Sequence, residues 1–174
     1  MLRRFLGFMI AASLSMVAGC GYHTLGAPTH LPPDARTLSV PVFATRTEAY
    51  HTETALTDAV IREFAARSGM RVTPATDSDS DVVLHGTILN ETVAPLTYNT
   101  STQQSSSFLI TLVVSVTLKD RGGKVLYENK NYVFREQYQS TSDLPTFLDE
   151  RPAAIDRLSR DFARALVADV LEGI

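Results

Sequence analysis

The sequence predicts an α+β fold, a two-layer sandwich in which two helices pack on one face of a four-stranded mixed sheet. Three observations predict this fold class. Segments 52–68 and 152–172 carry apolar residues at three- and four-residue spacing, which is typical of amphipathic helices. Residues 108–119 alternate between apolar and polar side chains, which is typical of a half-buried strand. The elements follow in the order β-α-β-β-β-α.

The first strand is expected at residues 37–43. Because Pro41 has no N–H to donate, this strand should lie at an edge of the sheet or contain a bulge. The helix at 52–68 follows, and Gly69 comes directly after it, where a left-handed residue commonly ends a helix. The apolar face of this helix consists of Leu56, Ala59, Val60 and Phe64.

The second strand is expected at residues 82–93, and Pro95 should mark its end. Residues 97–107 have no charge and no apolar periodicity, so they are interpreted as a polar loop. The composition of this loop favours a flexible connector, with a polar surface in a wet cavity as the alternative. The strand at 108–119 then continues the sheet.

A turn is expected at residues 120–123, because its two glycines tolerate the backbone angles of a tight hairpin. The return strand covers 124–136. Its alternation changes phase near Asn129, which predicts a β-bulge. A second polar loop at 137–143 leads to the last helix.

The helix at 152–172 begins with Pro152 in its first turn and is followed by Gly173. The strand–helix–strand unit at the start should give a right-handed parallel pair, and the later strands an antiparallel meander. Both helices then share one face of the sheet. The buried stripe of the last helix is Ile155, Leu158, Phe162, Leu166 and Val170.

Residues 1–19 are interpreted as a signal peptide, with Arg3 and Arg4 before an uncharged apolar run. This run ends in the tetrapeptide Val-Ala-Gly-Cys, which resembles the lipobox of bacterial lipoproteins. Its Cys20 is the only cysteine in the chain, so no internal disulfide can form.

Lipidation is therefore expected on Cys20, with residues 20–35 as the lipidated N-terminus and tether and residues 36–174 as a single α+β domain. Acyl chains on a cysteine anchor a protein stably when two or more are present. Gly21 follows the cysteine, where lipoproteins of the inner membrane often carry Asp. The resemblance thus implies the outer membrane.

Composition argues against several function classes. Without residues 1–19 the chain keeps 14 basic and 19 acidic residues, a formal charge of −5, which disfavours nonspecific binding of nucleic acid. No catalytic motif is present, and none of the four histidines has a partner at metal-ligand spacing. We expect no enzyme activity, no metal and no cofactor.

Three cations, Lys119, Arg121 and Lys124, surround the predicted hairpin turn, with Asp120 among them. One interpretation is protection of the sheet edge and solubility. The other is a local site for anionic head groups.

Several segments together resemble the lipopolysaccharide-assembly lipoprotein (LptE-like) family. They are Cys-Gly-Tyr-His from Cys20, Leu-Ser-Val-Pro-Val-Phe from Leu38, Leu-Thr-Asp-Ala from Leu56, Asp-Val-Val-Leu-His-Gly-Thr-Ile from Asp81, Thr-Leu-Val-Val-Ser-Val from Thr111 and Gly-Lys-Val-Leu-Tyr-Glu from Gly123. The resemblance spans nearly the whole chain after the leader, in short hydrophobic patches.

The resemblance implies a non-enzymatic outer-membrane lipoprotein, facing the periplasm and the barrel lumen. Such a protein plugs and helps assemble an LptD-type β-barrel, which carries lipopolysaccharide to the cell surface. The uncharged loop at 97–107 would suit the wet lumen of a large barrel. The resemblance also implies lipopolysaccharide as a ligand, whose phosphates family members contact through basic residues. The candidates by charge and place are Lys119, Arg121, Lys124, Lys130 and Arg135.

A second hypothesis is a tethered periplasmic adaptor, either an activator of peptidoglycan synthases or a component of a secretion channel. Such lipoproteins begin with a similar Val-Pro-Val-Phe strand and Leu-Thr-Asp-Ala helix. The long polar segment before a Val-rich hairpin favours the assembly lipoprotein.

Overall fold

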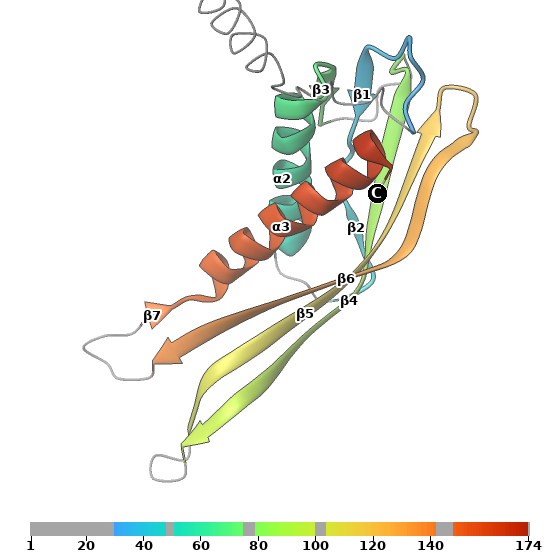
Figure 1. Cartoon of the computed structure of the whole chain (residues 1–174). Coiled ribbons are helices and arrows are strands. Elements are labelled where there is room, and N and C mark those ends of the chain that lie inside the picture. The colour runs from blue at the N-terminus through green and yellow to red at the C-terminus, as the bar shows by residue number, and fades with distance from the viewer. Residues whose placement is uncertain (1–29, 48–50, 75–78, 100–103, 142–147, 174) are drawn as a thin grey trace, which may run out of the picture.

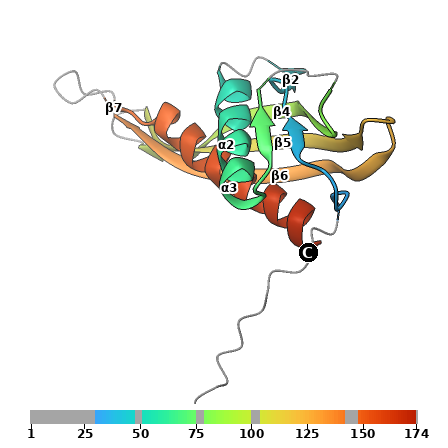
Figure 2. The ribbon, with the colours of Figure 1, turned by 90° about the horizontal axis from the view of Figure 1, so that it is seen from above.

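The computed structural model describes residues 30–47, 51–74, 79–99, 104–141 and 148–173. The expected leader, Cys20 and most of the expected tether lie outside these residues. Two helices and a mixed sheet form an α+β fold, which confirms the predicted class. Both helices lie on the same face of the sheet (Figure 1, Figure 2).

The sheet has more strands than the four that were predicted. Their order is β3-β1-β4-β5-β6-β7, with β2 paired to β4 outside this path. The additional strands contain only two or three residues each, which is too short for an alternating pattern to reveal. The bounds are Thr37–Ser39 (β1), Ala44–Thr45 (β2), Arg71–Thr73 (β3), Val82–Asn99 (β4), Gln104–Asp120 (β5), Val125–Thr141 (β6) and Leu148–Asp149 (β7).

The first predicted strand is divided at Pro41. β1 pairs in parallel with β3 on one side and with β4 on the other, so the predicted parallel pair is confirmed and the predicted edge position is wrong. Val40 still donates its N–H to the carbonyl of Thr73 at 2.8 Å. Pro41 has no N–H, and the chain resumes pairing only at β2.

The antiparallel meander of β4, β5 and β6 is confirmed, but its strands are longer than predicted. Pro95 does not end β4, because a register shift after it lets pairing continue to Asn99. The predicted polar loops were too long, since residues 97–99, 104–107 and 137–141 are strand. Backbone pairing continues there although no alternating apolar pattern marks it.

The predicted bulge of β6 is confirmed. Val114 pairs with Tyr132, whereas Val116 pairs with Asn129, so β6 has an additional residue between these pairs. The additional residue shifts the alternation of β6 by one position. As a result, Tyr132 and Tyr138 after the bulge are both buried on the helix side of the sheet.

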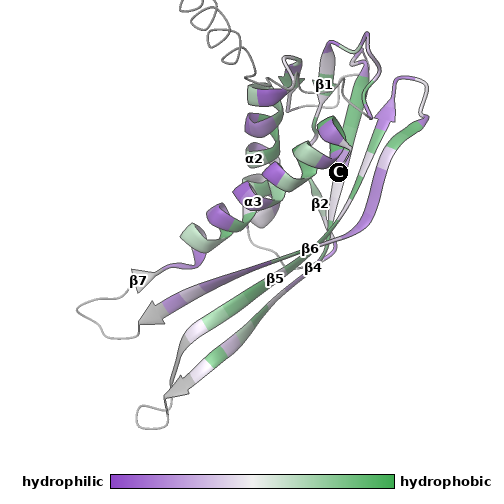
Figure 3. Ribbon diagram, in the orientation of Figure 1, coloured by the Kyte–Doolittle hydropathy of each residue, from purple (hydrophilic) through white to green (hydrophobic). Residues whose placement is uncertain are grey.

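Helices α2 (Thr52–Arg67) and α3 (Arg151–Glu172) agree with the prediction within one residue at each end. The apolar stripes predicted for both helices are buried. Gly69 and Gly173 follow the helices with φ of 68° and 65°, as expected of left-handed residues that end helices. Figure 3 shows hydrophobic and hydrophilic residues alternating along both helices. Among the described residues, no helix is long and apolar enough to span a bilayer.

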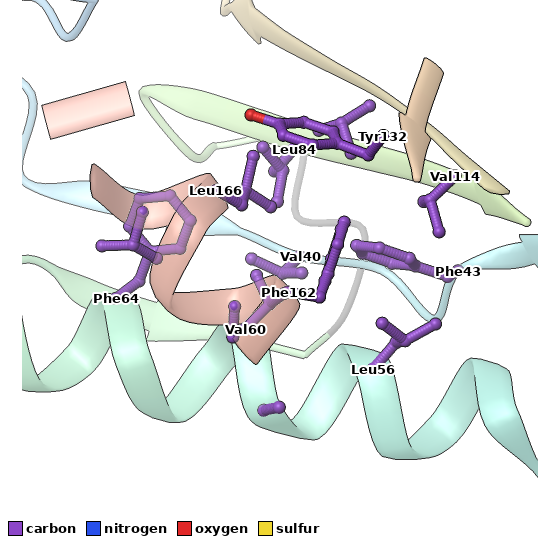
Figure 4. Packing of buried hydrophobic residues seen from close by; sticks show 14 of the residues in the cluster. Val40, Phe43, Leu56, Val60, Phe64, Leu84, Val114, Tyr132, Phe162 and Leu166 are labelled. Atoms are coloured by element: carbon purple, nitrogen blue, oxygen red, sulfur yellow. The ribbon is translucent and has the colours of Figure 1, made fainter. Parts of the chain in front are cut away.

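The core lies between the two helices and the inner face of the sheet (Figure 4). Phe162 of α3 is fully buried and meets the rings of Phe43, Tyr132 and Phe134 edge-on, with centroids 5.5–6.1 Å apart. Gly86 of β4 lies directly beneath the ring of Phe43, and a Cβ at this position would overlap that ring. A glycine is therefore required for this close approach.

Candidate functional site

Strands β4, β5 and β6 form a long ribbon with two distinct ends (Figure 1). At one end, residues 119–125 join β5 to β6, and we call this segment the hairpin end. We call residues 90–99 and 104–111 of β4 and β5 the far end. It begins beside the start of α3, where Glu91 contacts Arg151 and Ile110 is still buried, and then continues beyond the two helices. All of the predicted ligand-binding cations lie on β5, β6 or the turn between them.

The turn of the hairpin end is closed by its own hydrogen bonds. The N–H of Asp120 donates to the carbonyl of Lys124, and its carbonyl accepts the N–H of Gly123. Its Oδ1 accepts the N–H of Lys124 at 2.9 Å. Gly123 has φ of 83°, which most other residues avoid. These hydrogen bonds therefore fix the backbone conformation of the turn that carries Arg121 and Lys124.

Three of the five predicted cations meet at the hairpin end. Arg121 is largely exposed, and its guanidinium lies 3.2 Å from Oδ1 of Asp81. Lys119 is half-buried and Lys124 is exposed. Among the described residues, no carboxylate lies within ion-pair distance of either lysine. Two of these cations are thus available to an external anion.

Asp81 connects the hairpin end to the start of β1. One carboxylate oxygen accepts the N–H groups of Arg36 and Thr37 at 2.9 and 3.0 Å and the Thr37 hydroxyl at 2.8 Å. The Arg36 amide first, and then the Thr37 hydroxyl, hold the pKa of Asp81 below its ordinary value of 3.8. The positive charge of Arg121 acts in the same direction. Sequence reasoning missed this network, since its members lie 40 or more residues apart.

The other two predicted cations lie away from this cluster. Lys130 is exposed next to the bulge of β6 and pairs with Glu128 at 3.3 Å. Arg135 is exposed further along β6, opposite Thr111. It is eleven residues from Lys124, about 36 Å along the strand. The five candidates therefore do not form one site.

Two shallow hollows flank the hairpin end where the described chain begins. Both include Pro32 and Asp120 in their walls. The first, of about 330 Å³, is also lined by Asp34, Asp81 and Arg121. The second, of about 370 Å³, is also lined by His30, Leu31, Lys124, Val125 and Leu126. The first described residues therefore pack directly beside the hairpin.

A tyrosine pair holds the base of this hairpin to the end of α3. The hydroxyls of Tyr127 and Tyr132 both donate to Oδ2 of Asp169, the former at 3.2 Å. Burial raises the pKa of both tyrosines, so both stay neutral donors. His30 packs on the ring of Tyr127 with centroids 5.1 Å apart. The sequence offered no signal for this contact beyond the phase change of β6.

The far end contains one buried ion pair and several exposed apolar side chains. The side chain of Glu91 is only 3% exposed and lies 3.0 Å from Arg151, the first residue of α3. Beyond this pair, Val93 and Leu96 of β4 are 38% and 48% exposed. In the described part of the chain, β5 is the only strand paired with β4 after Ile88. One edge of the far end is therefore open.

The described residues contain no group of three His, Cys, Asp or Glu side chains that could hold a metal ion. The features that these residues do offer are cations beside two shallow hollows of mixed polarity and a strand edge without a described partner. Both features are suited to binding a partner or an anion.

Comparisons with known proteins cover most of the chain. The model of the family described as LptE, lipopolysaccharide-assembly, matches residues 35–170. No curated protein matches the chain. Solved structures of low sequence identity share the fold.

One is the uncharacterized lipoprotein B of Nitrosomonas europaea, with 12% identity, 84% of this chain and 88% of that chain covered, and a TM-score of 0.53. The Xanthomonas campestris protein XCC0632 has 17% identity, coverage of 84% and 87%, and a TM-score of 0.53. PelC of Paraburkholderia phytofirmans, a dodecamer, has 15% identity, coverage of 84% and 91%, and a TM-score of 0.50. At these identities the likeness concerns the fold alone.

Proposed function

The chain belongs to the LptE lipopolysaccharide-assembly family, and we propose from this premise that it plugs and helps assemble an LptD-type β-barrel in the outer membrane. It is a lipopolysaccharide-assembly lipoprotein of the cell envelope. The family match carries the proposal, because it extends from before β1 to the last turn of α3. The identity of the barrel partner and the location in the outer membrane belong to the proposal.

The shape of the far end supports a role inside a polar lumen. Residues 97–107 carry no charge and are rich in Ser, Thr and Gln, which suits the water-filled interior of a large barrel. Val93 and Leu96 are exposed on the same ribbon, where a partner would remove them from water. On this account β4 and β5 continue beyond the helices to contact the partner.

The proposed role is non-enzymatic and rests on binding. Lys119, Arg121 and Lys124 at the hairpin end, and Lys130 and Arg135 along β6, remain the candidates for contact with lipid phosphates. Their separation in the structure means that they serve at least two different contacts. Arg121 and Lys130 are the weaker candidates, because Asp81 and Glu128 already pair with them.

The anchor has a direct test. We expect Cys20→Ala to abolish retention in the membrane fraction, because the acyl chains on Cys20 are the proposed anchor of the mature chain. Fractionation of cells that produce the wild type or the variant, followed by immunoblotting, measures this. A variant that remains in the membrane fraction would contradict lipidation at Cys20.

The partner is tested by purifying the tagged lipoprotein from detergent-solubilised outer membranes and identifying what accompanies it by mass. A stoichiometric large β-barrel that survives washing is the expected result. A tagged outer-membrane lipoprotein of unrelated fold serves as the control. Recovery of a peptidoglycan synthase, or of no barrel, would favour the adaptor hypothesis and contradict the plug.

A further inference from the structure

We propose that the hairpin end rests on the anionic phospholipid surface of the leaflet that holds the acyl anchor. This inference rests on the proposed lipidation of Cys20 and assigns a contact that the family match does not. It concerns the exposed Lys124 and Val125, together with Lys119.

The first argument is the length of chain between anchor and fold. The described chain begins at His30, whose N–H donates to the carbonyl of Val170 at 3.3 Å and whose ring packs on Tyr127. His30 is ten positions after Cys20 in the sequence, so even a fully extended chain reaches about 36 Å. The residues beside His30 are therefore kept close to the bilayer.

The second argument is what lies beside this attachment point. His30 and Pro32 line the same hollow as Lys124 and Val125, so the hairpin is the nearest projecting part of the sheet. Figure 1 and Figure 2 show the first described residues and the β5–β6 turn at the same end of the molecule. The far end lies at the opposite end of the ribbon.

The third argument is the chemistry of the surface. Val125 is 47% exposed and lies opposite Lys119 in the sheet. Val125 also shares a hollow with Lys124, the residue before it. An apolar side chain next to two lysines that lack a carboxylate partner among the described residues matches a lipid surface, which offers phosphates above an acyl region.

Four described carboxylates lie at this end. Asp81 is paired with Arg121, and Asp120 accepts a backbone N–H within the turn. Asp34 lines the other hollow, together with Arg121, and Arg121 also donates to the carbonyl of Asp79. The hollow that contains Lys124 and Val125 has Asp120 as its only described carboxylate.

Fluorescence quenching tests the contact on the whole lipidated protein. Because the only natural cysteine is acylated, Val125→Cys provides a single free thiol for a fluorescent label. Val133→Cys is the matched control, since Val133 is 39% exposed on the same strand and about 26 Å further along it. Both proteins are reconstituted into vesicles of phosphatidylethanolamine and phosphatidylglycerol that contain a head-group quencher.

We expect strong quenching at position 125 and little at position 133. Each lysine near an anionic surface changes the equilibrium constant for contact with that surface about fivefold. Lys119→Gln with Lys124→Gln should therefore remove most of the quenching at 125, as should replacement of phosphatidylglycerol by phosphatidylcholine.

Equal weak quenching at both positions, in vesicles that carry the protein through flotation, would overturn the hairpin contact and leave the anchor intact. Quenching at 125 that appears only after lipopolysaccharide is added would also overturn it and would assign these lysines to that lipid. Failure of the protein to float with vesicles would overturn the anchor and the contact together.

Discussion

The two ends of the β4–β5–β6 ribbon are stabilised in different ways. Near the hairpin end, the inner face of the sheet is covered by α2 and α3, and side chains such as Val82, Leu84 and Leu118 are fully buried. At the far end, Val93 and Leu96 remain exposed, although they belong to the same strand. The comparison shows that most of the core lies at the covered end, and it supports the proposal that Val93 and Leu96 of the far end contact a partner.

The largest expected effect comes from placing an aspartate at the covered end, compared with the same substitution at the far end. Phe162→Asp places a charge among the rings of Phe43, Tyr132 and Phe134, and we expect the chain not to fold. Truncation of a buried Phe alone costs about 3–5 kcal/mol. Circular dichroism melts measure the effect. The matched variant Leu96→Asp at the far end should melt like the wild type.

An intermediate effect is expected where the two regions join. Arg151→Gln removes the partner of the buried Glu91 carboxylate, and we expect a loss of about 1–3 kcal/mol in the free energy of unfolding. Denaturant titration measures this loss. Arg164→Gln breaks an exposed pair on the same helix, with Asp161, and should cost less than about 1 kcal/mol. Equal losses in both variants would refute a special role for the buried pair.

The smallest expected effect concerns the hairpin end and depends on pH. Because the folded protein lowers the pKa of Asp81, its ionised carboxylate stabilises the fold above about pH 4, and this contribution disappears as the pH falls through the lowered pKa. We expect Asp81→Asn to melt at a lower temperature than the wild type at pH 7. The difference should shrink at strongly acidic pH. Asp58→Asn, on the exposed face of α2, is the matched control and should melt like the wild type at pH 7.

Sequence patterns predicted the parts of the fold that bury apolar side chains with a regular period. Both helices, the glycines that end them and the β6 bulge near Asn129 were found in this way. The patterns failed where pairing depends on the backbone alone. The far ends of β4 and β5 were therefore interpreted as a loop, and β3, which pairs with all three residues of β1, was not counted in the sheet.

The candidate cations could be found from charge, but their grouping could not. The sequence placed Lys119, Arg121 and Lys124 around one turn, and the structure agrees. It contained no signal that Arg121 is held by Asp81, or that His30 packs beside the same hairpin. These contacts join segments that are distant in the chain, and no local pattern records them.

The central claim is that the far end serves a partner rather than the fold. The direct test combines Val93→Asp with Leu96→Asp in the tagged lipoprotein and measures how much of the large β-barrel is purified with it. We predict a variant that melts like the wild type, stays in the membrane fraction and recovers much less barrel. Full recovery of the barrel by the folded variant would contradict the claim.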